Sequence, residues 1–151
     1  MKKYLIILLF LLGCSSPKYV NIYGEQQIAL YEHSNMHFIN VELNGIKTKL
    51  LIDTGASTSL LDISKSEELG FSYILLGKKQ YVGLGGFQDI YVPYDFKLNV
   101  FTISFLGADL SDIQEYFIQD GIYIVGIIGS DFLQKNNAII DFKINILYYN
   151  R

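Results

Sequence analysis

The chain reads Leu50-Leu51-Ile52-Asp53-Thr54-Gly55-Ala56-Ser57 at the point that decides its fold. The apolar residues before Asp53 indicate a buried strand, and the small residues after it indicate a tight loop in which glycine relieves backbone crowding. An acid at the mouth of a buried strand is a candidate for acid–base chemistry, because desolvation and neighbouring groups change its protonation. The structural alternative is an aspartate that hydrogen-bonds its own turn.

Two further stretches stand in order after that loop. Residues 83–87 read Gly83-Leu84-Gly85-Gly86-Phe87, a glycine-rich turn between two strand-forming runs. Residues 126–133 read Gly126-Ile127-Ile128-Gly129-Ser130-Asp131-Phe132-Leu133, an apolar pair and a glycine that lead into a short helix. For the first of these stretches, a merely structural hairpin turn is the alternative interpretation.

Together the three stretches resemble the motifs of the retropepsin family of aspartic proteases, in family order and over roughly residues 36–149. The resemblance implies an all-β fold, a closed acid-protease barrel with two or three short helices. It implies a catalytic loop formed by Asp53, Thr54 and Gly55. It also implies a flap over the substrate, with its tip formed by Gly83, Leu84, Gly85 and Gly86.

The chemistry of this family needs two carboxylates that share one proton, because like charges a few ångströms apart cannot both ionise. The chain contains one Asp-Thr-Gly, and the residues after Asp109, Asp112, Asp120 and Asp131 do not repeat it. We therefore expect the second acid to come from another copy in a two-fold homodimer.

The resemblance also assigns supporting roles around Asp53. Thr54 would join the two loops by hydrogen bonds, and the strand that contains Gly126–Gly129 would pack behind the Asp53 loop. Ala56 places a methyl group where pepsin-like relatives have a hydroxyl, as many retroviral enzymes do. Fewer donors to the charged carboxylate should extend activity toward weakly acidic pH.

Composition limits the other classes of function. The 151 residues suffice for one domain with a sizeable core, and the net charge of −3 argues against nucleic acid as a partner. A single cysteine allows neither an internal disulfide nor a Cys-x-x-Cys metal site. His33 and His37 lie four positions apart, but the β-prone context favours surface histidines over metal ligands. We expect no metal and no cofactor.

The N-terminus indicates export. Met1-Lys2-Lys3 is basic, Tyr4–Leu12 is apolar but too short to span a bilayer, and a cysteine follows at Cys14. The ending Leu-Leu-Gly-Cys resembles a bacterial lipobox, which implies lipidation of Cys14 and anchoring in the bacterial cell envelope. An ordinary signal peptide is the alternative. The expected organisation is a signal peptide over 1–13, a lipidated cysteine and tether over 14–35, and a protease domain over 36–151.

Periodicity predicts the elements between the motifs. The expected strands are one short strand around 27–31 and further strands over 36–43, 46–52, 78–82, 87–92 (bounded by Pro93), 95–105, 122–128, 138–142 and 146–149. The expected helices are 62–69 (capped by Asp62 or Ser64), 112–119 (with a capping box from Ser111 to Gln114) and 131–135 (capped by Ser130).

The function predicted from these features is an aspartic endopeptidase that acts on peptide or protein substrates as a lipid-anchored homodimer. Two alternatives remain open at this point. One is a peptide-binding module without turnover, because a groove of this kind binds extended peptides by strand pairing whether or not a dyad forms. The other is a structural lipoprotein of the envelope.

Overall fold

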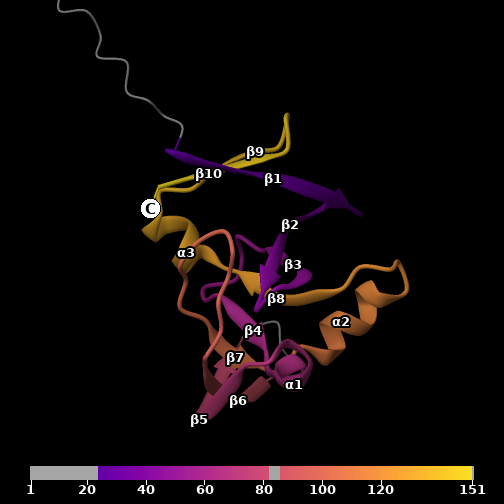
Figure 1. The fold of residues 1–151 in the computed structure, drawn as a ribbon, viewed down its shortest axis with the longest axis vertical. Helices are drawn as coiled ribbons and strands as arrows, with labels where there is room; N and C mark the ends of the chain where they lie inside the picture. The colour runs from indigo at the N-terminus through magenta and orange to yellow at the C-terminus, as the bar shows by residue number, and fades with distance from the viewer. Residues whose placement is uncertain (1–23, 82–85, 151) are drawn as a thin grey trace, which may run out of the picture.

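The computed structural model describes residues 24–81 and 86–150, which form a mostly β structure with short helices (Figure 1). The strands are β1 (Gln26–His33), β2 (Met36–Leu43), β3 (Ile46–Ile52), β4 (Leu60–Asp62), β5 (Ser72–Tyr81), β6 (Gly86–Tyr94), β7 (Leu106–Ala108), β8 (Ile124–Ile128), β9 (Ile139–Asp141) and β10 (Ile146–Tyr149). The helical segments are η1 (Ile63–Lys65), α1 (Ser66–Leu69), α2 (Ser111–Ile118) and α3 (Ser130–Lys135). The expected mostly β fold with short helices is confirmed.

The strands form one sheet in the order β5-β6-β7-β4-β8-β3-β2-β1-β10-β9. Within the described ranges β5 and β9 are its two edges, so the sheet is not closed into the barrel that the sequence predicted. Figure 1 shows why: the β5–β6 pair and the β9–β10 pair lie at opposite ends of the molecule. No helix in residues 24–81 or 86–150 is long and apolar enough to cross a membrane.

The hairpin of β2 and β3 forms where the sequence predicted it. The two strands pair in antiparallel register from His37 opposite Ile52 to Leu43 opposite Ile46. Both turn residues have positive φ, 51° at Asn44 and 84° at Gly45, as a tight two-residue hairpin turn requires. This rigid ladder ends directly before Asp53.

Strand β8 lies between β3 and β4 and joins the two sides of the Asp53 loop. It pairs in parallel with β3 and in antiparallel fashion with β4. All five of its residues are buried, which confirms the expected strand with burial on both faces, although it begins at Ile124 and not at residue 122.

Residues 95–105, expected as one long strand, run as an irregular segment although their apolar side chains pack on the core. A short backbone pairing with β2 remains, in which Leu98 lies opposite Leu43. The Asn44 N–H donates to the Lys97 carbonyl oxygen at 3.0 Å, and the Asn99 N–H donates to the Glu42 carbonyl oxygen at 3.2 Å. Two asparagine side chains flank it. Asn44 Oδ1 accepts from the Lys97 N–H at 2.8 Å, and Asn99 Oδ1 accepts from the Glu42 N–H at 2.8 Å. The expected long strand was wrong because alternation indicates which side chains are buried, whereas a strand also needs a partner along its length, and here the pairing is confined to the residues around Leu98.

Strand β1 belongs to the folded part of the chain. It pairs with β2 and with β10, whereas the sequence placed residues 14–35 in a tether with one short strand. The described fold therefore begins before the expected boundary at residue 36. The short run 27–31 extends to Gln26–His33 because neighbours on both sides complete its hydrogen bonds.

Several element ends also differ from expectation. Strand β6 continues through Pro93 to Tyr94, with Pro93 opposite Tyr73 on the edge strand β5. No side-chain cap forms at α2 or α3. At α2 the Gln114 side chain binds the chain at Ile122 and Ile124 instead of the helix N-terminus. At α3 the expected cap Ser130 is itself the first helical residue, and Gly129 precedes it. The Asp62 cap does form, since its Oδ1 accepts from the Ser64 N–H at 3.0 Å.

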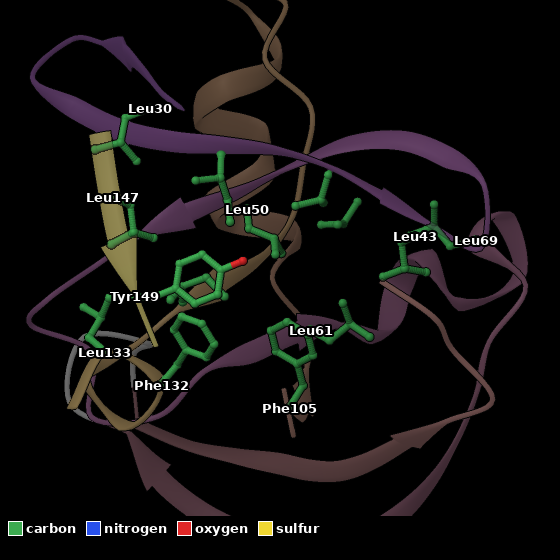
Figure 2. Packing of buried hydrophobic residues seen from close by; sticks show 14 of the residues in the cluster. Leu30, Leu43, Leu50, Leu61, Leu69, Phe105, Phe132, Leu133, Leu147 and Tyr149 are labelled. Atoms are coloured by element: carbon green, nitrogen blue, oxygen red, sulfur yellow. The ribbon is translucent and has the colours of Figure 1, made fainter. Parts of the chain in front are cut away.

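The core lies on both faces of β3. Leu50 belongs to a cluster with Phe132 and Tyr149, which Figure 2 shows packed between β10, α3 and the neighbouring strands. Leu51 belongs to a second cluster on the opposite face. Each buried leucine contributes roughly 1.5–3 kcal/mol, so the strand that delivers Asp53 is fixed from both sides.

Candidate active site

Asp53 follows β3 and opens the loop that the sequence singled out. Its N–H donates to the Ile128 carbonyl oxygen at 3.0 Å, which continues the β3–β8 ladder by one residue. The Asp53 side chain is half-buried, whereas Thr54 and Gly55 are exposed. The strand thus delivers the acid to the surface on a fixed support.

The carboxylate of Asp53 accepts a hydrogen bond from the Gly55 N–H at 2.8 Å. A Cβ atom at Gly55 would lie 3.2 Å from Asp53 Oδ1, so a side chain there would crowd the carboxylate. An Asx turn would make the same bond, and this contact alone fits both the functional and the structural interpretation of Asp53. The difference lies in what holds the loop from behind.

Residues at the end of β8 and the start of α3 anchor the loop. Ala56 accepts a hydrogen bond from the Ser130 N–H at 2.7 Å, and its own N–H donates to the Asp53 carbonyl oxygen at 3.1 Å. Together with the bond from Asp53 to Ile128, these contacts fix the loop at its start and at its middle. The expected packing of the strand with Gly126 and Gly129 behind the loop is observed.

Two glycines permit this close approach. A Cβ atom at Gly126 would lie 2.4 Å from the Leu60 carbonyl oxygen. At Gly129 it would lie 2.7 Å from the Thr58 carbonyl carbon and 2.9 Å from the Ala56 oxygen. Backbone atoms move little, so any larger residue at either position would push the loop away from β8.

Asp131 is a site residue whose role the sequence did not predict. Its Oδ2 accepts from the Ser59 N–H at 3.0 Å, and its Oδ1 accepts from the Ser59 hydroxyl at 2.6 Å and from the Phe132 N–H at 2.8 Å. From the sequence, Asp131 is weighed only as a second catalytic acid, and it does not fit that role. Its position at the start of a helix inside the third motif was the available signal.

The remaining predicted site residues are placed only in part. Gly83, Leu84 and Gly85 of the expected flap tip lie outside the described residues, as does Cys14. Gly86 begins β6 and pairs with Tyr81 of β5, so the expected hairpin around the tip is present.

The two histidines contact other parts of the surface. His33 Nε2 lies 2.9 Å from Asp120 Oδ2, and the His37 ring lies 4.8 Å from the Phe142 ring. Within residues 24–81 and 86–150 no group of three or more His, Cys, Asp or Glu side chains could hold a metal ion.

Two described groups have clearly shifted pKa values, and neither belongs to the Asp53 loop. The Ser111 hydroxyl and N–H donate to Asp109 and hold the pKa of that carboxyl below its usual value. Burial, with Glu68 accepting from the hydroxyl, raises the pKa of Tyr123 well above its usual value.

Comparison with known proteins places these features in a family. A family model described as aspartyl protease matches residues 39–132, which include Asp53 and Asp131. The UBA domain-containing protein Mud1 of Schizosaccharomyces pombe is 28% identical over 114 residues, which cover 74% of this chain and 32% of Mud1. DNA damage-inducible protein 1 of Saccharomyces cerevisiae is 25% identical over 120 residues, covering 74% of this chain and 25% of that protein. The chain thus spans about a third or less of the length of these relatives.

The fold also has a counterpart among solved structures. A retropepsin-like aspartic protease from Rickettsia conorii superposes with a TM-score of 0.50 at 19% identity, covering 83% of this chain and 91% of that one. At this identity the likeness concerns the fold alone.

Proposed function

This chain belongs to the aspartyl protease family, and on that premise we propose that it is an aspartic endopeptidase. One observation carries the proposal: Asp53-Thr54-Gly55 stands at the end of a strand buried on both faces, on a loop that β8 and α3 hold from behind. A turn with a merely structural aspartate does not need such a support.

The proposed chemistry uses two Asp53 carboxylates that share one proton. The charged carboxylate takes a proton from a water molecule, and the protonated one donates a hydrogen bond to the carbonyl of the peptide bond. The water then attacks the carbonyl carbon, and the leaving nitrogen receives a proton from the pair. Because the two acids titrate together, the pH dependence belongs to the dyad and not to either residue.

A homodimer would supply the second carboxylate. Each chain carries one Asp-Thr-Gly, and the exposed Thr54 and Gly55 leave that side of the loop open to a second copy. Asp131 is a poor candidate for the second acid, because three donors from Ser59 and Phe132 already occupy its carboxylate. A two-fold axis beside Asp53 would place the two loops side by side, with Thr54 joining them.

The segment Gly83–Gly86 would serve as the flap tip that folds over bound peptide and excludes water. Its glycine content suits a tip that changes conformation, because glycine accepts backbone angles that other residues resist. The substrate would be a peptide or an unfolded stretch of protein, bound in extended form by strand pairing.

Anchoring through Cys14 is part of the proposal, and it places the enzyme at the bacterial cell envelope. If Cys14 is lipidated, the protein will partition into the detergent phase, and Cys14→Ser will release it or leave it unprocessed. Two or more acyl chains hold a protein firmly, whereas one chain binds only marginally. Recovery of the wild-type protein in the aqueous phase would refute the anchor.

The experiment that tests the function combines solution mass with turnover. A soluble fragment from Ser15 onward should form a dimer, and its rate per chain on a peptide library should rise with protein concentration until the dimer is complete. A strict monomer at high concentration, unchanged by added peptide, would reject the dyad. A protein that binds peptides but leaves them intact would establish the binding module instead.

A further inference from the structure

We propose that Asp131 is a positioning residue of this site, which acts through Ser59 to hold the Asp53 loop in its working conformation. This inference rests on the proposed function, because the reaction assigns the loop its purpose. Asp131 touches no reacting atom in this account. Its role is to fix the third point at which the loop meets the β8–α3 connection.

The loop has anchors at regular intervals. Asp53 is tied to Ile128 and Ala56 to Ser130 by backbone hydrogen bonds. The chain reaches Ser59 three residues later, just before β4 begins. Here a side chain supplies the anchor, because the Ser59 N–H meets the Asp131 carboxylate and not a backbone carbonyl.

Ser59 is fully buried, and all its polar groups are engaged. Its hydroxyl donates to Asp131 at 2.6 Å and accepts from the Gly129 N–H at 2.9 Å. Its carbonyl oxygen accepts from the Leu106 N–H at 3.1 Å. Removing Asp131 would leave buried donors of Ser59 without an acceptor, so the loop would shift to reach water.

The chemistry of the contact explains why an acid occupies position 131. A carboxylate has only acceptors, and three donors converge on it from Ser59 and Phe132. An asparagine would turn an amide N–H toward one of these donors and lose at least one bond. Bonds to a charged acceptor are also about twice as strong as neutral ones.

The chain contains a matched control for this contact. Asp109 accepts from the Ser111 hydroxyl at 2.6 Å and from the Ser111 N–H at 3.0 Å, at the start of α2. The chemistry is the same, but both residues are exposed and tie only a local turn. Asp109→Asn therefore removes an equivalent pair without disturbing the Asp53 loop.

The test compares Asp131→Asn, Ser59→Ala, Ser59→Thr and Asp109→Asn in the dimeric protein. We expect kcat to fall about 10- to 100-fold in Asp131→Asn and Ser59→Ala, because small displacements of a catalytic group have effects of this size. KM should change by less than about threefold, since uniform substrate binding is unaffected. Ser59→Thr, which keeps the hydroxyl, and Asp109→Asn should retain kcat.

Hydrogen exchange gives a readout that does not depend on turnover. In Asp131→Asn the amides of Gly55 and Ala56 should exchange at least about tenfold faster, while the amides of β2 stay protected. Asp109→Asn should leave the loop unchanged. If Ser59→Ala does not fold, Asp131→Asn and Ser59→Thr still provide both measurements.

The outcomes separate the two proposals. Unchanged kcat and unchanged loop exchange in Asp131→Asn would overturn the positioning role while the peptidase stands. Equal losses of kcat in Asp131→Asn and Asp109→Asn would mean that both variants act by general destabilisation, and this result would also overturn the positioning role. If the wild-type protein cleaves no peptide, the proposed function fails, and loop exchange alone decides whether Asp131 holds the loop.

Discussion

The Asp53 loop and the β5–β6 hairpin are held in opposite ways. The loop is an irregular segment, yet hydrogen bonds tie it to β8 and α3 at Asp53, Ala56 and Ser59. The hairpin is a pair of long antiparallel strands with one register shift between Leu75 and Gly77, yet its outer strand β5 is an edge of the sheet. Inward from the hairpin, β6 pairs with β7 at Tyr91 opposite Gly107.

The side chains of the two regions differ in burial. Ser59 and Leu60 at the end of the loop are buried, whereas Ile74, Leu75 and Leu76 on β5 are 58%, 62% and 63% exposed. A catalytic group must keep its position, and the elements that fix it must themselves be packed. A segment that adapts to a peptide needs weaker attachment to the rest of the fold. The contrast therefore agrees with the roles proposed above, catalysis for the first region and adaptation to substrate for the second.

The largest effect should come from the acid itself. Asp53→Asn is nearly isosteric and keeps an oxygen that can accept the Gly55 N–H, so the fold should persist. Peptide turnover should fall by at least about 10³-fold, because the amide can neither take a proton from water nor share one with its partner. Turnover of a chromogenic peptide measures the loss.

Asp112→Asn, on the exposed face of α2, is the control and should retain full activity. The dimer should survive in Asp53→Asn, because the variant has no pair of carboxylates that must share a proton before the two loops can lie side by side. If Asp53→Asn still cleaves peptide, the dyad mechanism is wrong.

A second prediction breaks the support of the loop. Gly129→Ala would press a methyl group onto the Thr58 carbonyl, and overpacking of this kind costs about 1–3 kcal/mol or more. Chemical denaturation should show that loss of unfolding free energy, and turnover should fall with it because the loop moves.

Gly121→Ala is the control for this change. At φ +70° and with open space around its Cβ, it should cost about 1–2 kcal/mol from backbone strain without any effect on turnover per folded chain. If both variants lose stability and neither loses turnover, the close packing of β8 on the loop has no part in catalysis.

The parts of the fold that sequence could predict are those with local causes. Asn44-Gly45 between two alternating runs fixed the β2–β3 hairpin, and the apolar run before Asp53 fixed the strand that carries it. Residues 95–105 have the same alternation, but their described pairing with β2 is a single bridge between Leu98 and Leu43, flanked by bonds to the Asn44 and Asn99 side chains. Periodicity predicts burial, and it cannot say which partner completes the backbone hydrogen bonds.

The site shows the same limit. Asp53, Thr54 and Gly55 could be singled out because they form one contiguous motif, in which the Gly55 N–H reaches the Asp53 carboxylate two residues away. The role of Asp131 could not, because its partner Ser59 lies 72 positions away along the chain. Closure of the barrel was equally a matter of distant pairing, since β5 and β9 lie at opposite ends of the described fold.

A smaller effect, on the pH dependence of turnover, should follow from adding a hydroxyl at Ala56. Ala56 lies half-buried two residues after Thr54. By the resemblance to pepsin-like relatives, Ala56→Ser would offer a hydroxyl donor to the Asp53 carboxylate. A donor stabilises the charged form, so the pH–rate profile should move to lower pH by up to about one unit, equivalent to about 1.4 kcal/mol. Ala56→Gly adds no donor and should leave the profile in place. An unmoved profile in Ala56→Ser would show that the methyl group does not set the pH range.

The smallest effect should come from the exposed edge, and it tests the other half of the comparison. Leu76→Ser removes a side chain that is 63% exposed in the single chain, so the free energy of unfolding should change by less than about 0.5 kcal/mol. Leu61→Ala, at a position with 0% exposure beside the loop, should cost about 2–5 kcal/mol in the same denaturation experiment. If β5 adapts to peptide, Leu76→Ser should raise KM while leaving kcat unchanged, since the contact is made equally in the ground and transition states. A large loss of stability in Leu76→Ser would instead mean that this edge is covered in the working protein, and the contrast between a packed loop and an open hairpin would not hold.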